Sequence, residues 1–333
     1  MIKAFIRQNH QAQLKKDMGL LSDHFPMALQ ALSKMTADPE MISNFAKRKL
    51  LENRNAEVNS ESELMIQQTN WKDFIGKRVH APAYIVFFQR ELEEKGLQLT
   101  LDKFLPELIT GMGSAAFHGL IRLAYALELN LESEIAHALA AWTCTYQYLG
   151  KLPASGPHDL ASSYNAARET GLFENSVIKG ENIIQRMVTV SKDPEFPKLV
   201  ANLDRNRLEL SGLAEAVVTL YMSSSGNFTA LHAVTSTHAL RVLLPYLNQT
   251  SKSLALAYYW QALLAAAITF KTPALDVPLD NELKMSWDEI FILACQSTDE
   301  HVLKLVYTCF EESKVYTGSD IYKKAAYKKA MSE

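Results

Sequence analysis

The sequence predicts an all-α fold organised as a single large helical domain. Apolar residues recur at three- and four-residue spacing along most of the chain, which is the pattern of amphipathic helices. No segment alternates apolar and polar residues over strand length between turn dipeptides, so little or no sheet is expected. The 333 residues include only 13 glycines and 11 prolines, which argues against a turn-rich β fold. We expect residues 1–333 to form one domain, with residues 1–20 and 318–333 at its periphery.

Six helices are predicted in the first half of the chain. Ser22 or Asp23 can cap the first of them, and Pro26 is tolerated in its first turn. The polar stretch before it is expected to fray, and residues 53–68 lack a period and indicate a loop. The helices are expected at residues 24–35, 40–53, 84–95, 101–109, 114–129 and 131–149.

Eight more helices are predicted after a glycine- and proline-rich break at residues 150–157. They are expected at residues 159–168, 179–191, 195–203, 206–222, 229–247, 252–270, 286–296 and 299–313, with a loop at 271–281 and a basic tail at the end. Ser297 and Glu300 fit the capping-box pattern at the start of the last helix. The apolar run from Leu254 to Phe270 is too short for a membrane span and indicates a buried core helix.

Composition and charge exclude several classes of protein. Hydrophobic residues make up 48% and charged residues 21% of the chain, which excludes intrinsic disorder. The net charge of −3 provides no basic field for nucleic acid. Three cysteines without a C-x-x-C motif indicate free thiols in a reducing compartment. Because the N-terminus also lacks an apolar signal region, we expect a cytoplasmic protein without a membrane partner.

One glycine pattern imitates a dinucleotide motif. Residues 111–116, with the sequence GMGSAA, match G-x-G-x-x-A. That motif requires a strand before the glycines and a helix after them. The preceding residues indicate helix and loop instead, so a dinucleotide site is not expected here.

Histidines in apolar helices are the main candidates for chemistry. His118, Arg122 and Tyr125 follow each other at i, i+4 and i+7 on a helix that is apolar nearly all round. Buried polar groups of this kind must have partners, so a structural role and a functional role are both open. His24 precedes another apolar helix and by itself fits a capping or core role as well as a ligand role.

Two further pairs leave their roles open. His232 and His238 are six residues apart, or about 120° around a regular helix, which is poor geometry for two ligands of one ion. Either one of them lies outside the ligand set, or the helix is distorted. His301 and Lys304 lie together at the edge of an apolar stripe. Lys304 either extends its ammonium to solvent or is buried with a lowered pKa, in which case the amine could form a carbamate with CO2.

Four segments together resemble the questin oxidase-like family, and they occur in the family's order. They are residues 23–32 (DHFPMALQAL), 116–125 (AFHGLIRLAY), 231–241 (LHAVTSTHALR) and 299–304 (DEHVLK). The resemblance implies an all-α oxygenase; its fungal members open the ring of anthraquinones. It also implies a mononuclear non-haem iron held by four histidines and a carboxylated lysine. This chain is shorter than expected of the fungal enzymes and is interpreted as a bacterial member, so the resemblance carries the metal site further than the substrate.

Transferred to this sequence, the family's site is a buried histidine-rich centre with five candidate histidines for four places. The matching residues are His24, His118, His232, His238 and His301, with Lys304 as the lysine. We expect His301 to be the histidine outside the ligand set, because Lys304 already serves its helix. Arg122 is expected to hold an anionic phenolate and Tyr125 to relay a proton.

The sequence therefore predicts an iron-dependent oxygenase whose partners are O2 and an aromatic, quinoid or polyphenolic, small molecule. Two alternatives stay open. One is an NADPH-dependent Baeyer–Villiger-type monooxygenase without iron. The other is a non-catalytic helical binding protein in which the histidines form a structural network. Metal content separates the first prediction from both alternatives. The sequence predicts no oligomeric state.

Overall fold

The protein is described by a computed structural model that covers residues 1–13, 23–53, 64–169, 180–270, 275 and 283–332. Most of these residues are helical, and none belongs to a β-strand; a single isolated bridge joins His158 and Leu203. The all-α prediction is therefore confirmed. The predicted loops at residues 53–68 and 271–281 fall largely outside the described residues.

The helices follow each other along the chain with short connections. In the first part they are α1 (Ile2–Gln13), α2 (Phe25–Met35), α3 (Pro39–Asn53), α4 (Ala81–Lys95), α5 (Leu97–Leu108), α6 (His118–Leu129) and α7 (Glu132–Cys144). In the second they are α8 (Leu160–Glu169), α10 (Ile183–Ser191), α11 (Phe196–Ala201), α12 (Leu210–Ser223), α13 (Phe228–Leu243), α14 (Gln249–Ile268), α15 (Trp287–Gln296), α16 (Glu300–Val315) and α17 (Ile321–Ala330). Short 3-10 turns are η1 (Trp71–Phe74), η2 (Arg78–His80), η3 (Ile109–Gly111), η4 (Arg205–Arg207) and η5 (Leu244–Tyr246).

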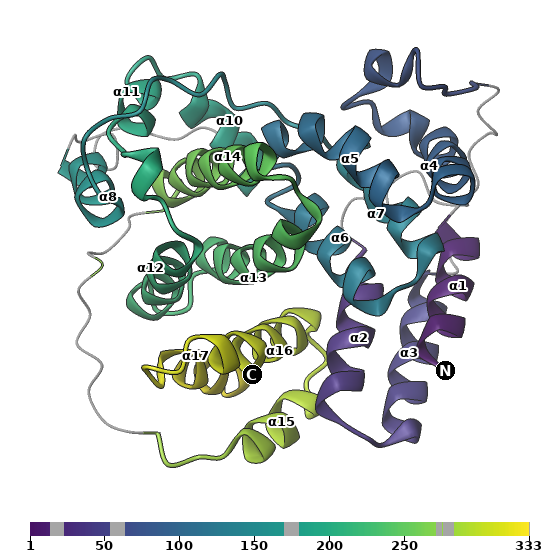
Figure 1. Ribbon diagram of the computed structural model, residues 1–333. Helices are drawn as coiled ribbons and strands as arrows, with labels where there is room; N and C mark the ends of the chain where they lie inside the picture. The colour runs from purple at the N-terminus through teal and green to yellow at the C-terminus, as the bar shows by residue number, and fades with distance from the viewer. Residues whose placement is uncertain (14–22, 54–63, 170–179, 271–274, 276–282, 333) are drawn as a thin grey trace.

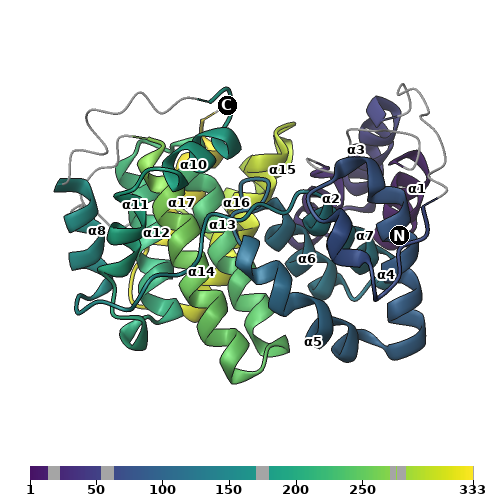
Figure 2. The same cartoon turned by 90° about the horizontal axis from the view of Figure 1, so that it is seen from above.

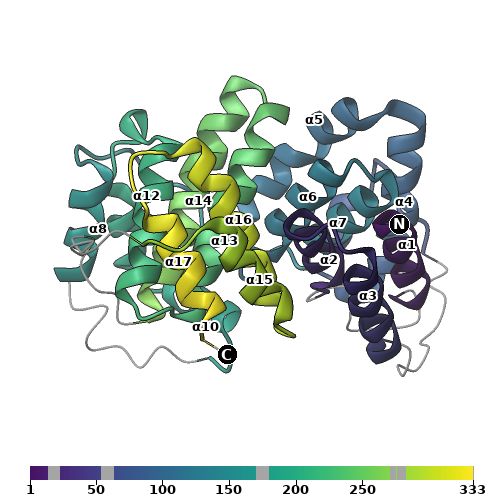
Figure 3. The same cartoon turned by 90° about the horizontal axis from the view of Figure 1, so that it is seen from below.

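The two parts of the chain lie side by side. Helices α1 to α7 occupy one side of the molecule and α8 to α17 the other (Figure 1). Views from above and below show the same division, with α13 and α16 next to α2 and α6 (Figures 2 and 3). Four helices make a closed circuit across this boundary, because α2 packs on α6 and α16, and α13 packs on the same two helices. Their termini position the candidate site.

Helix α14 is a core helix, as the sequence predicted. Its residues Tyr259, Trp260 and Leu263 are buried. None of the helices in the described part of the chain is both long enough and apolar enough to cross a membrane. Small residues bring other core helices close together: a Cβ atom on Gly119 of α6 would lie 2.5 Å from Trp142 of α7.

The chain ends are better packed than the sequence predicted. Residues 2–13 form helix α1 instead of fraying, because Ile6 is fully buried. The C-terminal tail forms helix α17, which packs on α12, α15 and α16. In it Ile321 and Tyr322 are buried, and the Tyr322 hydroxyl donates a hydrogen bond to the Ala214 carbonyl (3.0 Å). The basic residues that suggested a tail are the other face of this helix.

The capping box is at a different helix from the one predicted. Ser286 and Glu289 form it at the start of α15. Helix α16 begins instead with Asp299, whose side chain accepts a hydrogen bond from the His301 N–H (2.9 Å). The prediction for Ser297 and Glu300 was wrong because a better cap, Asp299, follows Ser297 within two residues.

Candidate functional site

Helix α6 begins at His118, four residues later than predicted, because the preceding residues form a left-handed turn. Ala115, Ala116 and Phe117 have φ angles of 51°, 53° and 69°. Such a conformation costs about 1–2 kcal/mol for each residue with a Cβ atom. The turn brings the Ala115 carbonyl to 2.6 Å from His118 Nδ1. Local strain thus fixes the orientation of a candidate ligand.

The glycines before this turn serve packing. A Cβ atom on Gly111 would lie 2.6 Å from the Tyr146 ring, and one on Gly113 would lie 2.8 Å from the Met187 methyl group. The segment in front of them is helix α5 and turn η3, as the sequence indicated, and not a strand. The G-x-G-x-x-A pattern is therefore explained by close helix packing.

Four histidines from four helices meet at the boundary between the two parts of the chain. His24 precedes α2, His118 opens α6, His232 lies in the second turn of α13 and His301 in the first turn of α16. His24 Nε2 lies 2.7 Å from His118 Nε2. The ring centroids are 4.6 Å apart for His24 and His301, 4.9 Å for His118 and His232, and 5.6 Å for His232 and His301. We call these four residues the histidine cluster.

The Nδ1 atom of each cluster histidine faces an acceptor. Nδ1 lies 2.6 Å from the Ala115 carbonyl in His118, and 2.8 Å from the Phe228 carbonyl in His232. His301 Nδ1 lies 2.8 Å from Asp299 Oδ1, and His24 Nδ1 lies 3.5 Å from Glu300 Oε2. An Nδ1–H donated to such an acceptor leaves the Nε2 lone pair available. Histidines that bind metals are oriented in this way.

Burial favours the uncharged form of three of the cluster histidines, His24, His118 and His232. Desolvation, followed by the positive charges that the neighbouring histidines and Lys304 would carry, holds the pKa of His24 and His118 well below the usual value. The pKa of His232 is lowered by the same causes. Neutral imidazole is the form that binds metals.

Lys304 is buried beside the cluster, one turn after His301 on α16. Its side chain is only 1% exposed, and burial lowers its pKa to about 8. Its amine forms no hydrogen bond or ion pair with the residues that the structure describes, and its charge acts on His24, His118 and His232. The buried alternative from the sequence is therefore the one observed.

The donor set fits a transition-metal ion. His301 Nε2 is buried without a hydrogen-bond partner, and the Nε2 atoms of His24 and His118 face each other although both rings are neutral. A cation near these lone pairs would satisfy them, and imidazole donors suit iron, zinc and copper. In the described part of the chain, no three His, Cys, Asp or Glu side chains are already arranged around one point as metal ligands. The imidazoles would have to turn to complete a ligand shell.

His238 does not belong to the cluster, contrary to its predicted grouping. Its Nδ1 lies 2.6 Å from Glu312 Oε1, and its Nε2 faces Glu128 Oε1 at 3.6 Å. Burial alone would lower the pKa of His238, but its bonds to these carboxylates outweigh burial and raise the pKa to about 9. His238 is thus a buried cation. His301 takes the place in the cluster that the sequence analysis gave to His238.

Arg122 and Tyr125 are also placed differently from the prediction. Arg122 is 3% exposed and bonds Glu134 through Nε (2.6 Å) and Nη2 (3.2 Å), with Asp23 at 3.8 Å. The Tyr125 hydroxyl lies 3.5 Å from the Lys304 carbonyl, and burial raises its pKa. Neither residue lines the pocket described next, which removes Arg122 from contact with a phenolate there and Tyr125 from direct proton transfer to it. The helix rises about 6 Å over four residues, which carries both side chains away from His118.

A pocket of about 550 Å³ opens onto the histidine cluster. All four histidines line it, together with apolar residues from the left-handed turn, α10 and α13. Its other lining residues are Arg78, Ala115, Ala116, Asn182, Ile183, Ile184, Arg186 and Phe228. Sequence analysis missed Arg78, Asn182 and Arg186, which come from separate segments without a shared pattern. Phe228 had a local signal, because it precedes His232 by one helical turn.

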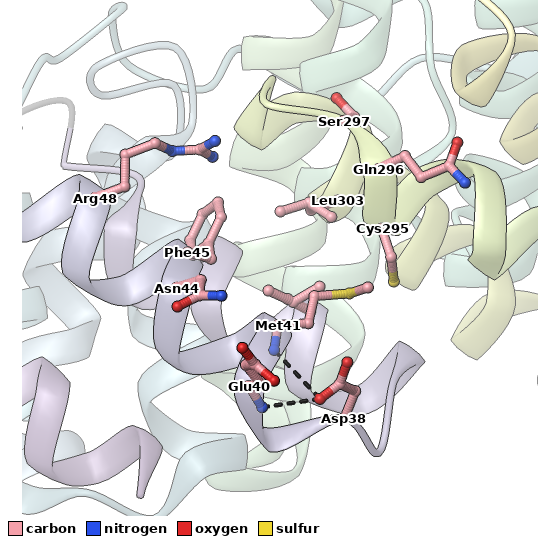
Figure 4. Close-up of a pocket in the computed structure, with 11 residues that line it drawn as sticks. Asp38, Glu40, Met41, Asn44, Phe45, Arg48, Cys295, Gln296, Ser297 and Leu303 are labelled. Carbon is pink, nitrogen blue, oxygen red and sulfur yellow. Dashed lines mark hydrogen bonds between the residues drawn. The ribbon is translucent and has the colours of Figure 1, made fainter.

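A second pocket of about 470 Å³ lies between α3 and the segment that joins α15 to α16 (Figure 4). Asp38 caps α3 there by accepting hydrogen bonds from the Glu40 and Met41 N–H groups. Cys295 points into it, and burial raises the pKa of that thiol to about 11, which leaves it protonated and unreactive. Among the described residues, no histidine lines this pocket. The pocket at the histidine cluster is therefore the candidate active site.

Comparison with known proteins gives one family and two relatives. A family model described as Questin oxidase-like matches residues 21–309. A Baeyer–Villiger oxidase of Paecilomyces divaricatus is 22% identical over 281 residues, which cover 70% of this chain and 60% of the relative. Another, from Pestalotiopsis microspora, is 23% identical over 286 residues, which cover 70% of this chain and 63% of the relative. The chain thus spans less than two thirds of the length of these relatives.

Proposed function

Because this chain belongs to the questin oxidase-like family, we propose that it is an oxygenase acting on an aromatic, quinoid or polyphenolic, small molecule. The names of the two fungal relatives support oxidation of this kind. A Baeyer–Villiger oxidation inserts oxygen between a carbonyl carbon and its neighbour, and quinones offer such carbonyl groups. The largely apolar lining of the pocket suits a flat ring system.

The histidine cluster is the observation that carries the proposal. We propose that it holds one non-haem iron through His24, His118, His232 and His301, with Lys304 as a fifth ligand. The bound iron would supply a centre at which O2 is activated for reaction with the aromatic ring. This set differs from the one predicted from the sequence, since His301 replaces His238. The two parts of the chain contribute to it jointly.

Lys304 would serve as a ligand in its carbamate form. A neutral amine adds to CO2 to give R–NH–COO⁻ and one proton, which changes a repelling cation into an anionic oxygen donor. A pKa of about 8 leaves part of the amine neutral near pH 7.5. Iron reconstitution in CO2-depleted buffer should give weaker metal binding than reconstitution with bicarbonate. Lys304→Met should remove this bicarbonate dependence.

The remaining residues of the site would hold the imidazoles and exclude water. The acceptors on Nδ1 would leave Nε2 of each ring as the atom available to an ion. The Phe228 ring packs edge-on against His232 and His301, with centroid distances of 4.6 and 4.8 Å. Ala115 and Ala116 add an apolar wall next to His118. These apolar parts of the lining favour contact with an aromatic ring over contact with solvent.

Oxygen consumption tests the proposal directly. Protein reconstituted anaerobically with Fe(II) would be mixed with hydroxylated anthraquinones and naphthoquinones in aerated buffer. We expect O2 uptake that depends on both the quinone and the iron and does not require NADPH. Uptake that requires NADPH and persists without iron would support the NADPH-dependent monooxygenase without iron instead. Binding of quinones without any O2 uptake would support the non-catalytic alternative.

A further inference from the structure

The pocket at the histidine cluster carries positive charge that the described residues of its lining do not neutralise. Arg78 of η2 and Arg186 of α10 both line it. Neither guanidinium group forms a hydrogen bond or ion pair with any residue in the described ranges. Arg78 is exposed, whereas Arg186 is half-buried and its Nε atom is fully buried without an acceptor. A buried donor of this kind indicates a missing acceptor.

The acidic residues near the cluster are engaged elsewhere. Asp299 bonds His301 and, at 3.0 Å, Lys329. Glu300 faces His24 and Lys49, each at 3.5 Å. Neither carboxylate lines the pocket, and no other aspartate or glutamate in the described part of the chain does. The described lining therefore combines two arginines, neutral imidazoles and apolar side chains.

Helix α10 adds to the positive electrostatic potential of the two arginines. It begins at the pocket, and Asn182, Ile183 and Ile184 from its start are lining residues. Asn182 Oδ1 accepts a hydrogen bond from the Gln185 N–H, so the cap is already made. The N-terminal end of a helix carries a partial positive charge. Arg186 lies one turn further along the same helix, so both features favour an anion at this side of the pocket.

We infer that this pocket selects aromatic substrates that carry an anionic substituent, and that Arg186 and Arg78 bind it. A carboxylate fits best, because it accepts two parallel hydrogen bonds from one guanidinium group. The ring would lie against Ala115, Ala116 and Phe228, with its reacting edge toward the cluster. Arg186 is the stronger partner because it is less exposed. This inference rests on the proposed function and narrows its substrate class.

A matched pair of ligands tests the inferred preference for an anionic substituent by binding alone, without a catalytic reaction. Anthraquinone-2-carboxylate and 2-(hydroxymethyl)anthraquinone have the same ring system and differ in charge. Their dissociation constants would be measured by fluorescence titration for the full chain with and without Fe(II). The variants are Arg186→Gln and Arg78→Gln. Arg48→Gln, an exposed arginine at the other pocket, is the control.

We expect the wild-type chain to bind the carboxylate at least about tenfold more tightly than the alcohol. Arg186→Gln should remove most of this preference, Arg78→Gln a smaller part, and Arg48→Gln none. Equal affinity for the two ligands, no binding of the carboxylate, or equal weakening of both by Arg186→Gln would overturn the inference. A preference for the carboxylate in protein that consumes no O2 would support the inference while contradicting the proposed oxygenase.

Discussion

Helix α13 presents two buried histidines to two different environments. His232 and His238 are 2% and 0% exposed and lie about 9 Å apart along the same helix. His232 faces imidazoles and a buried lysine, and its pKa is held well below the usual value. His238 faces two carboxylates, and its pKa is raised to about 9. Burial is the same for both, so the charges on the facing helices decide which histidine is neutral and which is a cation.

Helix α16 faces α13 and supplies the partners of both histidines. Its first turns bring His301 and Lys304 to His232, and its later turns bring Glu312 to His238. Glu312 also accepts a hydrogen bond from Arg241 (2.8 Å). The region around His232 contains an imidazole nitrogen, His301 Nε2, that is buried without a hydrogen-bond partner among the described residues. In the region around His238, the charges of His238 and Arg241 are paired with Glu312. This comparison supports the proposed ligand site at one end of α13, whereas the other end holds a structural ion pair.

Among the predicted effects, removal of the Glu312 charge should be the largest, because it breaks the ion pair around His238 and lowers the free energy of unfolding. In Glu312→Gln, His238 and Arg241 lose their shared carboxylate, and loss of one partner of a buried pair costs about 3–5 kcal/mol. We expect this loss in the free energy of unfolding of metal-free protein, measured by urea denaturation. Glu311→Gln, which removes a more exposed carboxylate paired with Lys314, should cost below about 1 kcal/mol.

The metal affinity of Glu312→Gln should stay at the wild-type value at temperatures where the variant is folded. A large fall in iron affinity together with stability would contradict the separation of the two regions. It would mean that the ion pair at His238 belongs to the metal site.

The pH dependence of stability sharpens the same comparison. His238 has a raised pKa in the folded state, so its contribution is fully present below about pH 6.5 and is lost as the pH rises through about 9. We expect the difference in unfolding free energy between wild type and His238→Gln to shrink across this window. Denaturant titrations of both proteins at intervals from pH 6 to 9.5 would show it. A constant difference would mean that His238 is not a cation in the folded protein.

Removal of the acceptor that supports a cluster histidine should have a smaller effect, which is a fall in metal affinity. Asp299→Asn removes the carboxylate that fixes the His301 ring, and loss of such a partner lowers metal affinity about 10- to 100-fold. Competition with a chelator measures this change. Lys329→Met is the matched control, since it removes the other partner of Asp299 but leaves the bond to His301. Equal effects of the two variants would show that Asp299 acts through the α17 contact.

Local signals in the sequence predicted much of the fold and part of the candidate site. Helical periodicity located most helices, and the four motifs that resemble the family contain His24, His118, His232, His301 and Lys304. The start of α6 was misplaced, because a left-handed turn made of Ala115, Ala116 and Phe117 lacks the glycine or asparagine that signals such a conformation. The terminal helices α1 and α17 are stabilised by burial against other helices, and the sequence of a short segment does not show such contacts.

The errors in the site share one physical cause. The role of a buried histidine depends on the groups that distant helices bring to it, and sequence spacing does not contain this information. The spacing of His232 and His238 was poor for two ligands of one ion, but it did not show which of them lies outside the ligand set, because Glu312, 74 residues away, was not visible as the partner of His238. Arg122 looked available to substrate because its partner Glu134 lies on the next helix. The two pocket arginines escaped detection for the same reason.

Iron binding by the two α13 variants tests the central claim most directly. Wild type, His232→Ala and His238→Ala would be loaded with Fe(II) without oxygen, desalted and analysed for metal, with circular dichroism to establish folding. His238→Gln, which keeps a polar side chain, replaces His238→Ala if the latter unfolds. We predict about one iron per chain for wild type and for the His238 variant, and loss of iron for His232→Ala. Full iron content in His232→Ala, or equal loss in a folded His238 variant, would contradict the claim.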